Sequence, residues 1–324
     1  MPNNDAHDTR TTFPANRATQ AVSLSVAARA AVVAGPNWPA EFDGVPVVFS
    51  GFELANKTPE VNDVGFTWSD TSIATVVTMD PDPLIVYDET GVTAERPADL
   101  TKNWTARTGN YALRLFVGAG TNWPEQSWNT TSTGIKTLWM GVDMRVPVNF
   151  DHKPRIKDDG TVSVGNNQKL FRLFMESYQG HQTSGGGSKV GMEFRRVTNT
   201  EAEGPGHSYW YVKNYNEFSN GGDQGNKRFI TIPQDQGKWM RICFRVQCSS
   251  TPGVADGSIE VWRKWEDEVV FTKEFDFPSQ QIPIRTLAGT VNAFKQGDLF
   301  GYQNAPYAVD TEFLWDNFEL AEVI

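Results

Sequence analysis

The sequence has few of the residues from which disulfides and metal centres are built. Of its 324 residues, only two are cysteine and four are histidine. Cys243 and Cys248 flank the end of one predicted strand and would face opposite sides of an extended chain. We therefore expect no disulfide between them and no metal site from this pair. Phosphate-binding loops, zinc-type spacings and a Ser-His-Asp signature are also lacking, so no cofactor is expected.

Long apolar runs and an excess of positive charge are missing as well. The best apolar run, residues 21–34, is interrupted by Arg29, is too short to span a bilayer and lies too far along the chain for a typical signal peptide. We therefore expect no signal sequence and no membrane partner. The formal net charge of −10 argues against a nucleic-acid partner bound by bulk electrostatics.

Aromatic residues, glycine and proline are abundant instead. The chain has 20 Phe, 11 Trp, 28 Gly and 18 Pro, a composition that favours many short strands joined by turns. Strand signals occur at similar spacing over residues 46–324, which predicts a single β domain. An N-terminal arm over residues 1–45 precedes it, and an Ala- and Val-rich stretch at 19–34 is predicted as a short helix within that arm.

The clearest strand signal lies in residues 238–265. Apolar and polar residues alternate along its first half, the period-two pattern of a half-buried strand. A turn rich in Ser, Pro, Gly and Asp follows at 249–257, and a second alternating strand ends near Trp265. Residues 137–146 and 312–320 show strand signals too, whereas 118–134 and 278–297 are predicted as long loops.

Two of these stretches carry a family resemblance. The hairpin at 238–265 resembles the late hairpin of concanavalin A-like jelly rolls, and Trp315–Phe318 resembles the last strand of that fold. The polysaccharide-lyase branch, with its alginate and glucuronan lyases, is the most similar. The resemblance implies an all-β fold, an antiparallel β-sandwich jelly roll with an extended N-terminal arm.

The polar sides of the predicted strands carry arginines, carboxylates and tryptophans. In a jelly roll one sheet is concave, so its polar side is a candidate glycan-binding groove. Arginine binds carboxylates bidentately, and an aromatic face offers apolar area to sugar C–H groups. The candidate residues are Trp139, Arg145, Arg172, Glu176, Glu193, Arg195, Arg241, Arg245 and Trp262. Cross-strand ion pairs on a solvated sheet and a protein–protein interface are the alternative interpretations.

A catalytic alternative rests on two short motifs. Residues 294–303 are similar to the Phe-Lys-x-Gly-x-Tyr-x-Gln strand of alginate lyases, and Gln179-Gly-His181 fits their Gln-x-His spacing. The match is partial, because four residues rather than one separate Gly297 from Tyr302.

The resemblance implies roles for these residues in β-elimination. An arginine and an amide would neutralise the uronate carboxylate, while a histidine and a tyrosine would transfer the protons. The residues that match these roles are Arg195 or Arg172, Gln179, His181 and Tyr302. No pair of carboxylates with the spacing of a retaining glucanase is present.

A group of acids in a predicted turn suggests calcium as the one possible metal. Asp80, Asp82 and Asp88 would supply oxygen ligands, although their spacing fits no EF-hand loop and acids are common in turns.

Two functional classes follow. The first is a non-enzymatic surface or structural protein with a carbohydrate-binding jelly roll, a virion decoration or tail-associated protein of a bacteriophage. Residues 1–45 would anchor it to other copies of itself or to a capsid or tail protein, and a polysaccharide or cell-surface glycan would be its other partner. The second is a polysaccharide lyase acting on a polyuronate, secreted or periplasmic by an unrecognised route. The imperfect motifs and the missing signal sequence favour the first.

Overall fold

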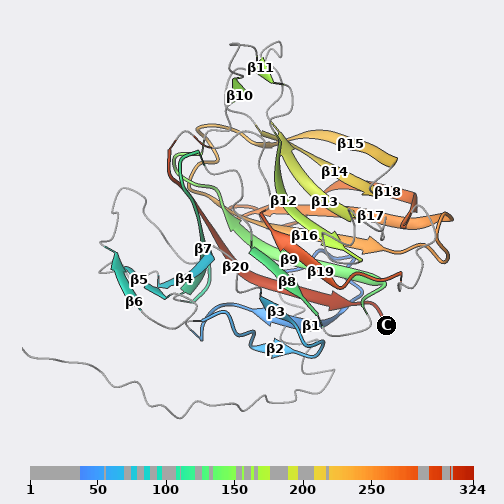
Figure 1. Cartoon of the computed structure of the whole chain (residues 1–324), viewed down its shortest axis with the longest axis horizontal. Helices are drawn as coiled ribbons and strands as arrows, with labels where there is room; N and C mark the ends of the chain where they lie inside the picture. Colours follow the sequence, from blue (N-terminus) through green and yellow to red (C-terminus); the bar gives the residue numbers. More distant parts are fainter. Residues whose placement is uncertain are drawn as a thin grey trace, which may run out of the picture.

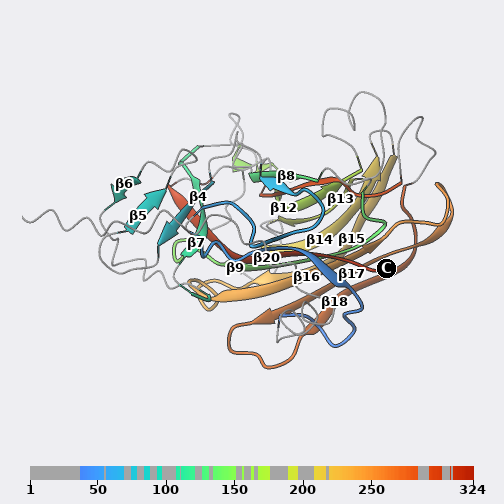
Figure 2. The same ribbon diagram turned by 90° about the horizontal axis from the view of Figure 1, so that it is seen from below.

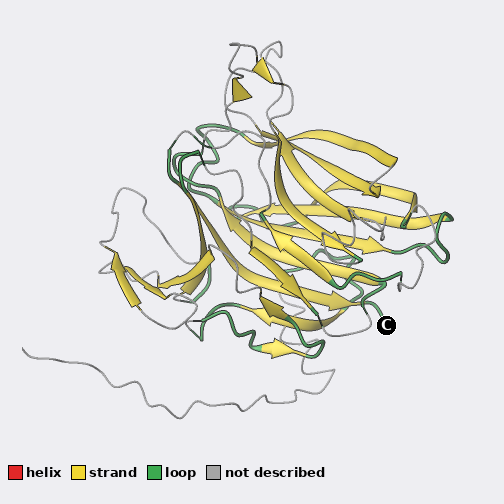
Figure 3. Cartoon of the chain, viewed as in Figure 1, coloured by secondary structure: helices red, strands yellow, loops and turns green. Residues whose placement is uncertain are grey.

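The computed structural model shows an all-β protein (Figure 3). It describes residues 37–54, 56–68, 74–78, 84–87, 93–96, 107–109, 111–120, 126–130, 134–150, 155–156, 162–163, 167–175, 189–195, 208–216, 219–283, 292–300, 307 and 309–324. Within these ranges no helix is long and apolar enough to cross a membrane. Every strand pair is antiparallel, as predicted.

The strands form two large sheets (Figure 1). Sheet A has eleven strands: β18 (Thr272–Gln281), β17 (Ala255–Trp265), β16 (Trp239–Gln247), β9 (Thr137–Arg145), β20 (Thr311–Glu322), β7 (Tyr111–Val117), β4 (Ala74–Thr78), β5 (Leu84–Tyr87) and β6 (Thr93–Arg96) in order, with β1 (Val45–Ser50) beside β20 and β2 (Val61–Asn62) beside β1. Sheet B has seven strands: β15 (Ser219–Ile230), β14 (Ser208–Asn216), β13 (Lys189–Arg195), β12 (Asn167–Phe174), β19 (Gln296–Leu299), β8 (Gln126–Asn129) and β3 (Thr67–Trp68) in order. Strands β10 (Arg155–Ile156) and β11 (Val162–Ser163) pair only with each other.

The core lies between the two sheets, which stack as layers (Figure 2). Phe171 of β12 and Phe244 of β16 meet edge to face across it, with ring centroids 5.0 Å apart. The inward residues of β9 and β16 are the apolar set that the alternation predicts: Leu138, Met140, Val142, Met144, Met240, Ile242, Phe244 and Val246. Burial of each such side chain stabilises the fold by about 1.5–3 kcal/mol. The predicted antiparallel β-sandwich is therefore confirmed.

Two segments predicted as loops overlap strands of sheet B. Strand β8 lies within residues 118–134, and β19 begins at Gln296, at the end of residues 278–297. Both are four residues long and supply one large apolar side chain to the core, Trp128 and Leu299, so neither shows a sustained alternation. Gly297 lets β19 approach β8, because a Cβ at this position would overlap the Trp128 indole.

The N-terminal arm lies mostly outside the described residues, and so does the predicted helix at 19–34. The described end of the arm, residues 37–44, crosses the outer face of sheet A and leads directly into β1. The division of the chain into an arm and one β domain remains a prediction.

Candidate functional site: the two outer faces of the sandwich

The candidate glycan-binding residues do not share one face. Trp139, Arg145, Arg241, Arg245 and Trp262 stand on strands β9, β16 and β17 and point away from the core on sheet A. The other described members of the set, Arg172, Glu193 and the backbone of Arg195, belong to β12 and β13 of sheet B, and Glu176 lies outside the described residues. The two outer faces therefore have to be considered separately.

The outer face of sheet A is covered by the chain's own residues Asn37–Gly44, which we call the strap. Trp38 and Phe42 stack on each other with ring centroids 4.4 Å apart, and both meet the ring of Trp139 edge-on. Trp139 stacks in turn on Trp262 at 4.9 Å. These rings form a second apolar cluster, in which Trp139 and Trp262 are 0% and 1% exposed. A sugar ring would reach Trp139 only if the strap moved.

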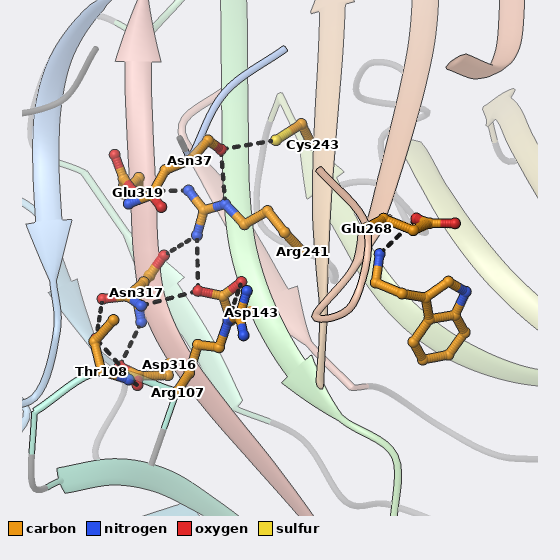
Figure 4. Close-up of polar contacts among 11 residues, drawn as sticks. Asn37, Arg107, Thr108, Asp143, Arg241, Cys243, Glu268, Asp316, Asn317 and Glu319 are labelled. Carbon is orange, nitrogen blue, oxygen red and sulfur yellow. Dashed lines mark hydrogen bonds and ion pairs between the residues drawn. The ribbon is translucent and has the colours of Figure 1, made fainter. Parts of the chain in front are cut away.

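Beneath the strap, Arg241 lies at the centre of a buried polar cluster (Figure 4). Its Nη2 donates to Oε1 of Glu319 at 2.7 Å, and its Nε donates to the Asn37 carbonyl at 3.0 Å. The indole of Trp38 donates to Oε2 of Glu319 at 3.1 Å. Although burial opposes the charge of Arg241, the carboxylates of Glu319 and Asp143 raise its pKa above the ordinary value. One guanidinium thus joins the strap to β16 and β20.

The cluster continues along a bulge in the middle of β20. Asp143 accepts a hydrogen bond from Nδ2 of Asn317 at 2.9 Å, and Asn317 has a φ of 47°. Asp316 accepts from the backbone N–H groups of Thr108 at 3.0 Å and of Asn317 at 2.7 Å. Burial raises the pKa of Asp316 to about 8, and the nearby Asp143 carboxylate adds to this rise. Asp316 is therefore largely protonated near neutral pH.

Gly141 on β9 makes room for this arrangement. A Cβ at Gly141 would lie 2.9 Å from Cη2 of Trp38 and would overlap the guanidinium of Arg241. Any larger residue would displace the strap, so Gly141 allows the strap to lie against the outer face of sheet A.

Outside the strap, the same face carries ion pairs between neighbouring strands. Arg245 contacts Glu260 at 3.3 Å and Asp43 of the strap at 3.4 Å. Lys273 contacts Glu260 at 3.1 Å and Asp276 at 3.0 Å. These are the cross-strand pairs expected as the alternative to a sugar surface, each worth about 0.2–1 kcal/mol. The charges of these residues are thus engaged within the protein.

The outer face of sheet B has one buried ion pair at its centre. Arg172 of β12 and Asp298 of β19 are opposite in register, and Nε and Nη2 of the guanidinium both bond to the carboxylate, with Nε 3.0 Å from Oδ1. Arg172 also lies over the Phe174 ring, 5.4 Å from its centroid. The pair is 3% and 1% exposed. Because this bidentate contact already satisfies Arg172, its predicted role in holding a uronate carboxylate would require the pair to open.

Beside this pair stand four neutral polar side chains, which we call the uncharged row: Thr67, Ser127, Asn129 and Gln296. Register places Thr67 opposite Asn129, Asn129 opposite Gln296, and Ser127 opposite Asp298. They alternate with inward core residues and so point outward. Thr67 is exposed and the other three are half-buried. None of the four side chains bonds to another described residue.

The predicted catalytic residues are only partly within the described chain. Gln179, His181 and Tyr302 lie outside it, and for Arg195 only the strand position is described. The structure does bring together the strands that precede these residues, because β12 and β19 are neighbours. The catalytic roles of these residues remain predictions.

The proposed calcium acids, Asp80, Asp82 and Asp88, also lie outside the described residues. Within the described ranges no three His, Cys, Asp or Glu side chains are grouped to hold a metal ion. Both cysteines are free and buried, in agreement with the sequence, and burial raises the pKa of each thiol to about 12.

Sequence reasoning missed the residues that distinguish the two faces. Gln296 lies inside the Phe-Lys-x-Gly motif and Asp298 follows it directly, so the motif drew attention to the right strand but not to these side chains. Trp38 precedes the first strand, and its partner Glu319 is 281 residues away. No local sequence pattern predicts a contact between residues so far apart in the chain.

The two packed antiparallel sheets define a β-sandwich. No protein-family model matches the sequence, and no curated protein sequence is detectably similar. Solved structures of similar fold include the PL-14 alginate lyase from Aplysia kurodai, at 14% identity and a TM-score of 0.45, over 67% of this chain and 85% of that one.

Two further structures show similarity over comparable lengths. Alginate lyase vAL-1 from Chlorella virus is 12% identical with a TM-score of 0.39, over 67% of this chain and 87% of that one. The exoplasmic/lumenal domain of VIP36 in its Ca2+/Man3GlcNAc-bound form is 13% identical with a TM-score of 0.37, over 68% and 80%. At these identities the similarity concerns the fold alone.

Proposed function

We propose that this protein is a carbohydrate-binding jelly roll and that the sugar chain lies on the outer face of sheet B. The observation that carries the proposal is the difference between the two outer faces. On sheet A, Trp139 and Arg241 contact the strap, Trp262 packs in the same apolar cluster, and Arg245 is engaged in ion pairs. On sheet B the uncharged row offers hydroxyl and amide groups that no described residue uses.

The position of the strap supports a surface-anchored role. The chain arrives at Asn37 on the outer face of sheet A, opposite the proposed sugar face. An assembly that holds residues 1–36 would then leave sheet B directed outward. We propose on this basis a non-enzymatic surface protein, such as a virion decoration or tail-associated protein, which docks through its N-terminal arm.

Affinity electrophoresis of the full chain in gels that contain neutral and acidic polysaccharides tests the sugar-binding proposal. Ser127 and Ser258 are half-buried serines on the outer faces of sheets B and A, respectively. We expect retardation by at least one polysaccharide, its loss in Ser127→Trp, and its retention in Ser258→Trp. Retardation lost only in Ser258→Trp would place the sugar on the other sheet, and no retardation in any gel would refute binding.

Sedimentation tests the anchoring proposal separately. We expect the full chain to form a larger complex with itself or a capsid protein, and a chain lacking residues 1–36 to stay monomeric with unchanged sugar affinity. The anchoring role would be contradicted if the full chain is monomeric both alone and with capsid protein and if removal of residues 1–36 changes neither result.

A polysaccharide lyase is the second candidate, since β12 and β19, whose flanking segments carry the two lyase-like motifs, are adjacent. Elimination creates a C4–C5 double bond that absorbs ultraviolet light. A rise in absorbance with alginate, glucuronan, hyaluronan or a heparin-like chain that disappears in His181→Ala and Tyr302→Phe would establish the lyase. The binding proposal predicts no rise.

A further inference from the structure

The uncharged row runs straight across three strands of sheet B. Thr67, Asn129 and Gln296 occupy successive register positions on β3, β8 and β19, and Phe174 of β12 is the next partner in the same line. Ser127 lies one outward position along β8, opposite Asp298. Adjacent strands are about 4.8 Å apart, so the row presents polar groups at a regular interval across the sheet.

The chemistry of this row matches hydroxyl groups rather than carboxylates. A sugar hydroxyl both donates and accepts a hydrogen bond, and the amides of Asn129 and Gln296 each offer both functions, as do the hydroxyls of Thr67 and Ser127. A carboxylate is held best by a charge-assisted bond from a cation, which the row does not contain.

The described charged groups of β12 next to the row stand opposite carboxylates of neighbouring strands. Asp298 engages Arg172 bidentately, and the pair is buried. Lys169 of β12 lies opposite Glu193 of β13 in register, and Glu193 is 1% exposed. A polyuronate would therefore have to compete with carboxylates of the protein for these cations.

Lys295 is the cation adjacent to the row along the chain. Its side-chain stem lies near Gly134, where an added Cβ would be 3.1 Å from Lys295 Cγ, and the residue is half-buried. Replacing Lys295 with an uncharged residue therefore tests whether positive charge contributes to sugar binding.

We propose that the uncharged row is a binding subsite for a neutral, hydroxyl-rich sugar chain and not for a polyuronate. The inference rests on the proposed sugar-binding function and names its ligand class. Asn129 and Gln296 are the central hydrogen-bonding residues of this subsite.

The test is equilibrium binding of the full chain to soluble neutral polymers (β-glucan, mannan, xylan and galactan) and acidic ones (alginate, glucuronan and polygalacturonate), at low and high salt. We expect binding to a neutral polymer that is insensitive to salt. Asn129→Ala and Gln296→Ala should each weaken it by about threefold to tenfold, as expected for the loss of a neutral hydrogen bond.

The matched control is Gln247→Ala, since Gln247 is a half-buried glutamine on the outer face of sheet A. It should bind as tightly as the unmodified protein, and so should Lys295→Gln. Thermal unfolding of each variant verifies that it is folded.

The results distinguish failure of the neutral-sugar subsite from failure of sugar binding as a whole. Binding only to acidic polymers, weakened by salt and by Lys295→Gln, would overturn the neutral-sugar subsite while leaving sugar binding intact. Neutral-polymer binding that is unchanged in both row variants would overturn the placement of the subsite. Binding to no polymer would refute the proposed function itself.

Discussion

The two outer faces of this sandwich have similar amino-acid chemistry but differ in what their polar side chains contact. Each has a buried arginine bonded to a carboxylate from another strand: Arg241 with Glu319, two strands away on sheet A, and Arg172 with Asp298 of the neighbouring strand on sheet B. On sheet A the guanidinium also binds the strap, and aromatic rings close the surface. On sheet B the adjacent positions are hydroxyls and amides without described partners. A polar strand face can thus be covered by the chain itself, as the strap covers part of sheet A.

The largest effect is expected from breaking the arginine cluster of sheet A. Arg241→Met should lower the free energy of unfolding by about 3–5 kcal/mol, because Glu319 and Asp143 would remain buried without their cation. The control, Arg245→Met, removes a more exposed arginine from the same strand face and should cost about 1 kcal/mol or less. Urea denaturation measures both, and equal losses would show that the buried cluster has no special structural role.

The strap should be the next most important contributor. Trp38→Ala should lower the free energy of unfolding by about 3 kcal/mol, because it removes a buried ring that contacts Phe42 and Trp139. Leu54→Ala, at a half-exposed position, should have little effect. Sugar affinity should not change in Trp38→Ala. A gain in affinity would mean that the strap covers a second sugar site on sheet A.

The buried carboxyl of Asp316 predicts a pH dependence of stability. Its pKa is raised to about 8 in the folded protein from 3.8 in the unfolded chain, so between these values the folded state holds a proton that the unfolded state has lost. Its contribution is therefore fully present below about pH 4 and is lost as pH rises toward 8, by up to about 1.4 kcal/mol per pH unit. Asp316→Asn should flatten the decline in stability between pH 5 and pH 8. An unchanged slope would exclude Asp316 as its source.

The smallest effect should come from the exposed ion pairs. Lys273→Ala removes contacts with Glu260 and Asp276 and should cost about 0.2–1 kcal/mol, a loss that added salt should reduce. A salt-independent loss of several kcal/mol would show that these pairs act as a buried network.

The sequence predicted the fold class and the inward side of the central strands correctly. Strands β9 and β16 are long enough for alternation to separate core residues from outward ones, and a sheet has only two faces. The alternation could not assign strands to sheets, which is why residues of both faces were grouped into one groove. Alternation did not reveal β8 or β19, because each has a single large inward side chain, and β19 was indicated only by the lyase-like motif at 294–303.

The strap was beyond local sequence reasoning for a different physical reason. Its stability comes from contacts between Trp38, Arg241 and Glu319, which are brought together only when the sheet has formed. Arg241 was predicted to be outward and polar, and no prediction was made for Glu319. The burial of both side chains depends on where residues 37–44 lie, and the spacing of residues along the strands does not encode this.

The most direct test of the difference between the faces is hydrogen–deuterium exchange of the full chain with and without a saturating polysaccharide. We expect added protection in β3, β8 and β19, with exchange in the strap, β16 and β17 unchanged. Protection confined to the strap, β16 and β17 would contradict it, because the sugar would then occupy the face that the chain itself covers.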